Sequence, residues 1–184
     1  MAPRPIAYTV FAVACVCALL ALGRLCSGAP ASVGTGWATR RGLEPHLVID
    51  RQTARTVERL HSGDVVRPGD LVQVSYVAAG HRYGVVVSVD GRGAVTLHHP
   101  AVAHQASRIE VRGEVPLDHA FELDDAPGFE RFFFVAASAA PLDASLVLAA
   151  AHRLARDGLV ASRQQPLPLP ADVVQSSFLL RKTP

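Results

Sequence analysis

The chain of 184 residues is long enough for one domain and a short additional segment, and its composition (49% apolar, 18% charged) is typical of a globular protein. All 16 acidic residues and 16 of the 18 basic residues follow Cys26, so this larger part of the chain has no net charge by count. A neutral body creates no field that would draw it to nucleic acid or to an anionic membrane surface. We therefore expect no nucleic-acid partner.

The N-terminal region contains an apolar run, residues 6–23, with Arg4 before it and Arg24 after it. As a helix, these residues would be about 27 Å long, which is close to the hydrocarbon thickness of a bilayer. Residues 1–26 are therefore predicted to be a single transmembrane helix that anchors the protein in the inner membrane. Two alternatives stay open: a signal peptide that is cleaved after the small residues 29–31, and lipidation of Cys26.

The side of the membrane on which the body lies is predicted from the same region. Arginines lie on both sides of the apolar run, at Arg4 and at Arg24, Arg40 and Arg41, and their count does not favour export. A very short N-terminal tail followed by a folded body is nevertheless usually exported. We therefore predict a periplasmic domain.

Residues 27–43 are rich in Gly, Ser, Ala and Thr and are predicted to be a flexible linker to a globular domain over residues 44–184. The three cysteines, Cys15, Cys17 and Cys26, all precede this domain. The domain can therefore form no disulfide and no thiolate metal site.

From residue 46 onwards, short runs of β-type residues alternate with turn residues. A helix is predicted over 144–156, with Asp143 as N-cap, Gly158 after its end, and a buried face that includes Leu146 and Leu154. This order predicts a mainly β (α+β) fold: an antiparallel β-sandwich or open barrel with one C-terminal amphipathic helix. The predicted strands are 46–50, 71–79, 82–90, 94–99, 107–113, 119–125, 130–138 and 175–182, and residues 55–60 are either a hairpin partner of the first strand or a helical turn.

The stretch SVDGRGAVTLHHP, residues 88–100, places an acid, two glycines and a histidine pair close together. Asp-Gly between two β-type runs is a strong hairpin signal, because glycine accepts a positive φ without a steric clash. With a loop of two or four residues, His98 would share a face with Val87, and His99 would lie on the other face with Ser88. The two histidines could then not bind one metal ion, and we expect a strand end with one half-buried and one exposed imidazole.

An acidic cluster lies within residues 114–130, where there is no Lys or Arg before Arg131. Asp124 and Asp125 are adjacent and would diverge on a strand, which disfavours a catalytic carboxylate pair. We interpret the cluster as a solvated edge, or as a docking surface for a basic partner segment. Its members are Glu114, Asp118, Glu122, Asp124, Asp125 and Glu130.

No motif for a nucleophile or a metalloprotease is present in the domain, so we predict no catalytic, cofactor-binding or metal-binding residue. His152 is interpreted as structural. A metal-dependent hydrolase that would use His98 or His104 with a carboxylate stays open as the least favoured reading. Residues that could stack on a sugar or another ligand are Trp37, Tyr76, Tyr83, Phe121 and Phe129.

Over about residues 60–182 the chain resembles a family of bacterial domains of uncharacterised function. The resemblance rests on a turn ending in Gly69-Asp70, on the hairpin motif quoted above and on an acidic L-D-x-x-x-G-x-E-R element at 123–131. It implies an exported or membrane-tethered accessory domain without enzymatic activity, of a kind found near anti-sigma-factor genes or joined to kinase or caspase-like modules. The matching positions are Gly63, Gly69, Asp70, Tyr83, Ser88, Asp90, Gly93, Val95, Pro100, Leu123, Asp124, Gly128, Glu130 and Arg131.

These observations together predict a non-enzymatic, membrane-tethered domain outside the cytoplasm. We expect it to act in protein interaction, in envelope signalling or sigma-factor regulation, with an unidentified protein partner and no cofactor. The alternative is a module that binds cell-wall glycan or a small molecule.

Overall fold

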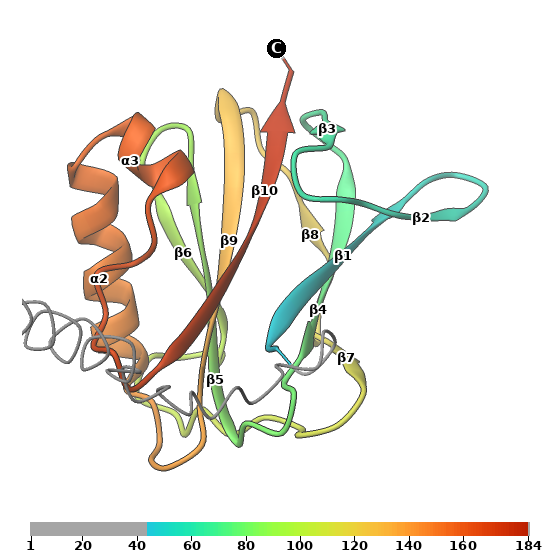
Figure 1. Ribbon diagram of the computed structural model, residues 1–184. Coiled ribbons are helices and arrows are strands. Elements are labelled where there is room, and N and C mark those ends of the chain that lie inside the picture. The colour runs from blue at the N-terminus through green and yellow to red at the C-terminus, as the bar shows by residue number, and fades with distance from the viewer. Residues whose placement is uncertain (1–43, 184) are drawn as a thin grey trace, which may run out of the picture. The chain divides into compact units, whose positions relative to one another are not determined.

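A computed structural model describes residues 44–183, which fold into two five-stranded sheets packed face to face, with two helices on the outer face of one sheet (Figure 1). The two sheets share no strand and do not close into a barrel. Of the two predicted architectures, the structure is therefore the sandwich. The elements are β1 (His46–Gln52), β2 (Val57–Arg59), β3 (Val65–Val66), β4 (Leu71–Val77), β5 (Tyr83–Asp90), β6 (Val95–His99), β7 (Glu114–Pro116), β8 (Phe121–Glu122), β9 (Gly128–Ala137), α2 (Ala144–Arg156), α3 (Leu159–Gln164) and β10 (Val174–Lys182).

The predicted transmembrane helix (1–26) and linker (27–43) lie outside the described residues. Within residues 44–183, neither helix is long and apolar enough to cross a bilayer.

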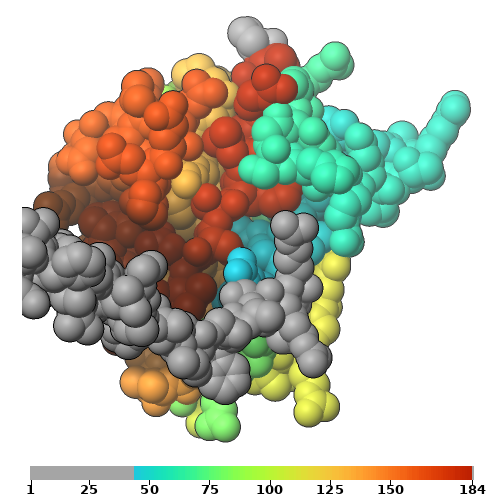
Figure 2. All heavy atoms as spheres, viewed as in Figure 1, coloured from blue at the N-terminus to red at the C-terminus, as the bar shows by residue number. Residues whose placement is uncertain are grey.

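The first sheet has the order β2-β1-β4, and β7 and β8 both pair with the far side of β4. β1 pairs with β4 along its whole length, from His46 opposite Val77 to Gln52 opposite Leu71. β2 is the hairpin partner of β1, so residues 55–60 contain a strand and not a helical turn. The exposed tip of this hairpin projects from the body of the domain (Figure 2).

The second sheet has the order β3-β10-β9-β5-β6, in which only the β3–β10 pair is parallel. β9 lies at its centre and is buried from Arg131 to Ala137. Its two faces contribute to two different cores, because the other sheet covers one face and the helices cover the other. This explains why the run after Arg131 is apolar without alternation.

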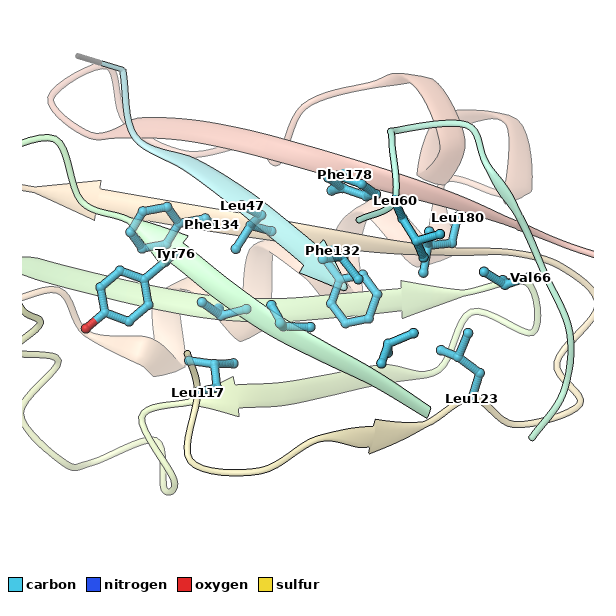
Figure 3. Packing of buried hydrophobic residues seen from close by; sticks show 14 of the residues in the cluster. Leu47, Leu60, Val66, Tyr76, Leu117, Leu123, Phe132, Phe134, Phe178 and Leu180 are labelled. Carbon is cyan, nitrogen blue, oxygen red and sulfur yellow. The ribbon is translucent and has the colours of Figure 1, made fainter. Parts of the chain in front are cut away.

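The larger core fills the space between the two sheets, where Phe132, Phe134 and Phe178 of one sheet meet Leu47 and Tyr76 of the other (Figure 3). The second core lies between β5, β9 and the helices and includes Val87, Phe133, Val147 and Leu154. Along β5 and β9, even-numbered residues therefore face the other sheet and odd-numbered residues face the helices. This parity determines the surroundings of every side chain on β5.

The predicted helix is confirmed as α2, with the Asp143 carboxylate accepting a hydrogen bond from the Ser145 backbone at 2.8 Å and with Gly158 after the C-cap Asp157. The prediction that Leu146 belongs to the buried face was wrong, because that side chain is 64% exposed. The buried stripe instead runs through Ala144, Val147, Ala150, Ala151 and Leu154, at helical spacing.

Two other predictions need correction. Residues 107–113 form no strand and make only an isolated bridge between Arg108 and Tyr83, and β7 begins after them at Glu114. The strand expected over 119–125 is reduced to the two residues of β8. The short strand β3 and the short helix α3 were not predicted.

A buried arginine joins the helices to the sheet. The Arg131 guanidinium donates to the backbone oxygens of Ser162 (2.9 Å) and Gln165 (2.8 Å) at the end of α3, and to the Ser177 hydroxyl. It also lies over the Phe133 ring, 4.5 Å from its centroid. The cation therefore meets carbonyl oxygens at a helix C-terminus, where a positive charge is favoured.

Candidate ligand-binding cleft

The hairpin between β5 and β6 has a loop of three residues, 91–93, and not the two or four that the sequence suggested. Asp90 N donates to Ala94 O, and Val89 pairs with Val95. Pairs in this register have the same parity, so His98 lies on the face of Ser88 and not on that of Val87. The face predicted for His98 was therefore wrong, because a loop that differs by one residue in length moves every side chain of the next strand to the opposite face.

A β-bulge in β6 then changes the face of the next residue. Val87 pairs with Leu97, whereas Val86 pairs with His99, so His98 is the extra residue. Because His99 is paired with Val86, whose side chain faces the other sheet, His99 also points between the sheets. The separation of the two histidines expected from a regular strand is thus wrong, and both imidazoles lie on the inner side of β6.

His98 packs between aromatic rings at the edge of the sandwich. Its ring centroid lies 4.4 Å from that of Phe121 and 5.3 Å from that of Phe132, and its Nε2 lies 2.9 Å from Ser88 Oγ. Its Nδ1 is buried and has no hydrogen-bond partner among the described residues. Burial lowers the pKa of His98 to about 4, so this imidazole is neutral at pH 7.

His99 lies beside Tyr76, with 6.2 Å between the ring centroids, and burial also lowers its pKa. Its buried Nε2 finds no partner within residues 44–183. His98 and His99 therefore each have one buried ring nitrogen without a hydrogen-bond partner among the described residues. Buried polar atoms without partners are rare in folded proteins, so these two nitrogens set this part of the sandwich apart.

A cleft adjoins these histidines, between edge strand β6 and the segment 115–122 of the other sheet. It consists of a first hollow of about 320 Å³, bounded by Tyr76, His99 and Asp118, and a second hollow of about 210 Å³, bounded by Thr96, Glu122 and Asp124. Both hollows are bounded by His98 and Phe121, so they adjoin each other along β6. β6 has five residues and is about 17 Å long.

The contact between Ser88 and His98 raises the question of a catalytic pair. A serine nucleophile needs a base that is a good proton acceptor near neutral pH and that is oriented by a third group. With a pKa of about 4, His98 is a weak base, and within the described part of the chain no carboxylate bonds to its Nδ1. The geometry therefore favours a structural hydrogen bond over an activated serine.

The structure brings the other sequence candidates into no common metal site. His104 is exposed in a different hollow, beside Pro141 and Asp143, and His152 is exposed on α2. In residues 44–183, no group of three or more His, Cys, Asp or Glu side chains could hold a metal ion.

The aromatic residues that were predicted to stack on a ligand lie in different parts of the domain. Tyr76 and Phe129 are buried, Tyr83 lines another hollow beside Arg82 and Arg108, and only Phe121 is a half-buried ring with a face in the cleft. Trp37 lies outside the described residues.

Most of the acidic cluster is compensated by basic residues. Arg59 binds Glu114 at 2.8 Å, Arg92 binds Asp125 at 2.9 Å, and Lys182 binds both Asp124 (2.5 Å) and Glu130 (2.9 Å). Asp124 and Asp125 thus have different basic partners, Lys182 and Arg92. Asp118 and Glu122, one in each hollow, make no ion pair within the described residues.

Lys182 pairs with two of the carboxylates that line the second hollow, and it was not singled out by the sequence. Its side chain is 1% exposed, whereas that of Glu130 is 12% exposed and that of Asp124 is 56% exposed. Burial alone would lower the pKa of Lys182, but the hydrogen bonds to Asp124 and Glu130 outweigh burial, and the pKa lies above its usual value. Lys182 is therefore a permanent cation that holds two carboxylates.

Acidification is expected to destabilise the domain through His98. An unfolded histidine has a pKa near 6.5, whereas folded His98 has a pKa of about 4, so the unfolded chain binds more protons between these values. The contribution of neutral His98 to the free energy of unfolding is then fully present above pH 6.5. It falls by about 3 kcal/mol as the pH drops to 4. His98→Phe, which keeps an aromatic ring against Phe121, is expected to flatten this loss in urea unfolding measured at pH 7, 5.5 and 4.5. An equal loss in both proteins would contradict the assignment.

Comparison of the chain with protein-family models, with curated proteins and with solved structures found no match. The resemblance to the bacterial domain family therefore stays a prediction.

Proposed function

We propose that the domain is a non-enzymatic binding module that holds a segment of a partner protein in the cleft between β6 and residues 115–122. The observation that carries this proposal is the pair of adjoining hollows beside β6, which share His98 and Phe121 as lining residues. A cleft that follows a strand for about 17 Å suits an extended chain better than a compact small molecule. The weak base at His98 and its unoriented Nδ1 support binding without catalysis.

Photo-crosslinking from inside the cleft tests this proposal. A photoreactive residue at Thr96, which is exposed and lines the second hollow, is expected to capture one distinct protein from membranes that contain the full chain. The same residue at Leu146, which is exposed on α2, is the control and is expected to give no such adduct. Ala101→Trp, which fills the first hollow from an exposed position, should abolish the Thr96 adduct.

Two results would contradict the proposal. One is the same protein captured from both positions, and the other is attachment of polysaccharide in place of protein, which would support the glycan-binding alternative.

The predicted location belongs to the same proposal. The apolar run at 6–23 would tether the chain to the inner membrane and place the domain in the periplasm, as an accessory to envelope signalling or sigma-factor regulation. Protease added to cells with a permeabilised outer membrane should then degrade the domain. Protection until the inner membrane is opened would place the domain in the cytoplasm.

A further inference from the structure

The side chains that line the cleft carry an excess of negative charge. Five carboxylates line its two hollows, and neither hollow is lined by a lysine or an arginine. Lys182 compensates two of them from behind, and Asp90 accepts hydrogen bonds from the backbone of Arg92 and Ala94. The carboxylates left for a ligand are Asp118 in the first hollow and Glu122 in the second, and both residues are exposed.

The floor between these two carboxylates is aromatic. Phe121 and His98 bound both hollows and meet edge to face, so they separate Asp118 from Glu122 along the cleft. The neutral state of His98 matters here, because a protonated imidazole would repel a cation at this point. The cleft thus presents a negative group, an apolar surface and a second negative group in sequence.

From this arrangement we infer that the partner segment is an extended peptide with two basic side chains flanking an apolar one. The inference rests on the proposed function and adds the chemistry of its ligand. Asp118 and Glu122 are four positions apart in the chain, so their Cα atoms are at most about 14 Å apart. In an extended peptide, residues i and i+4 span a similar length and point the same way, with residue i+2 between them. Basic residues at i and i+4 would bind Asp118 and Glu122, while an apolar residue at i+2 packs on Phe121 and His98.

Fluorescence anisotropy with the full chain in detergent tests this inference. The probe is a labelled, end-capped peptide Lys-Ser-Leu-Ser-Lys, and the comparison peptides are Glu-Ser-Leu-Ser-Glu and the rearranged Lys-Lys-Ser-Leu-Ser. We expect the first peptide to bind at least tenfold more tightly than either of the others. Its affinity should fall as salt rises from 50 to 300 mM, because exposed charges are screened.

The charge-removing variant Asp118→Asn/Glu122→Gln should weaken binding of the probe at least tenfold. Both positions are exposed, so the variant should unfold at the same temperature as the original protein. The matched control, Glu110→Gln/Asp172→Asn, removes two exposed carboxylates that line neither hollow and should leave binding unchanged.

Equal binding of the lysine and glutamate peptides, no binding of the lysine peptide, or binding insensitive to Asp118→Asn/Glu122→Gln would overturn the inference. The proposed function would survive any of these results if Thr96 still captures its partner and Ala101→Trp still prevents capture. Loss of that pattern would remove the proposed function itself, so the two failures can be told apart.

Discussion

Gly91→Ala is expected to destabilise the domain by at least about 3 kcal/mol, more than ordinary overpacking of a core. An added Cβ would lie 1.5 Å from the carbonyl oxygen of Pro127 and 2.7 Å from its carbonyl carbon. Both atoms belong to the backbone, and the Gly91 amide is itself bonded to Phe129 O at 3.0 Å. The loop can therefore not make room without breaking the contact between the β5–β6 hairpin and the start of β9.

Gly93→Ala in the same loop is the matched control. Gly93 has a φ of +80°, but the nearest atom to an added Cβ is 3.8 Å away. Its replacement is expected to lower the free energy of unfolding by only about 1–2 kcal/mol, because an alanine is strained at a positive φ. Denaturant unfolding of both variants should show the larger loss for Gly91, and the reverse order would refute the assigned roles.

Lys182→Met is expected to cost about 3 kcal/mol, because it leaves the mostly buried Glu130 carboxylate without its cation. The exposed carboxylate of Asp124 is solvated and should contribute little. The double variant Lys182→Met/Glu130→Gln removes the stranded charge and should recover a large part of the loss. These free energies can be measured by urea unfolding at pH 7.

A loss below about 1 kcal/mol for Lys182→Met would mean that water already screens this cluster. A double variant no more stable than Lys182→Met would show that the methylene chain of Lys182, and not its charge, supports this end of the sandwich.

The long strands and the main helix could be predicted because their signals are local. Alternation along 71–77 and the helical spacing after Asp143 both report which face is buried, and burial organises these elements in the structure. α3 escaped prediction for the same reason. Leu159 and Val160 are exposed, so its six residues carry no amphipathic pattern. Residues 107–113 contain apolar side chains in a strand-like order but find only one bridge to β5.

The cleft depended on two details that the sequence shows poorly. The GRG loop of three residues has a signal, because a glycine with positive φ at its third position is typical of such hairpins. The bulge at His98 has no signal that can be recognised in a single sequence. Lys182 likewise became visible only when β10 was placed beside β9, which brings Lys182 opposite Gly128 and near Glu130.

Because the bulge in β6 is one extra residue, the presence of both histidines beside the cleft depends on that single residue. Deletion of one residue at position 98 would restore a regular pairing of β5 with β6 and leave one histidine facing the other sheet. The hairpin and both cores would keep their residues, so such a chain should still fold. Divergent copies of this domain could therefore gain or lose the imidazole pair by insertion or deletion of one residue, without any change in the rest of the sandwich.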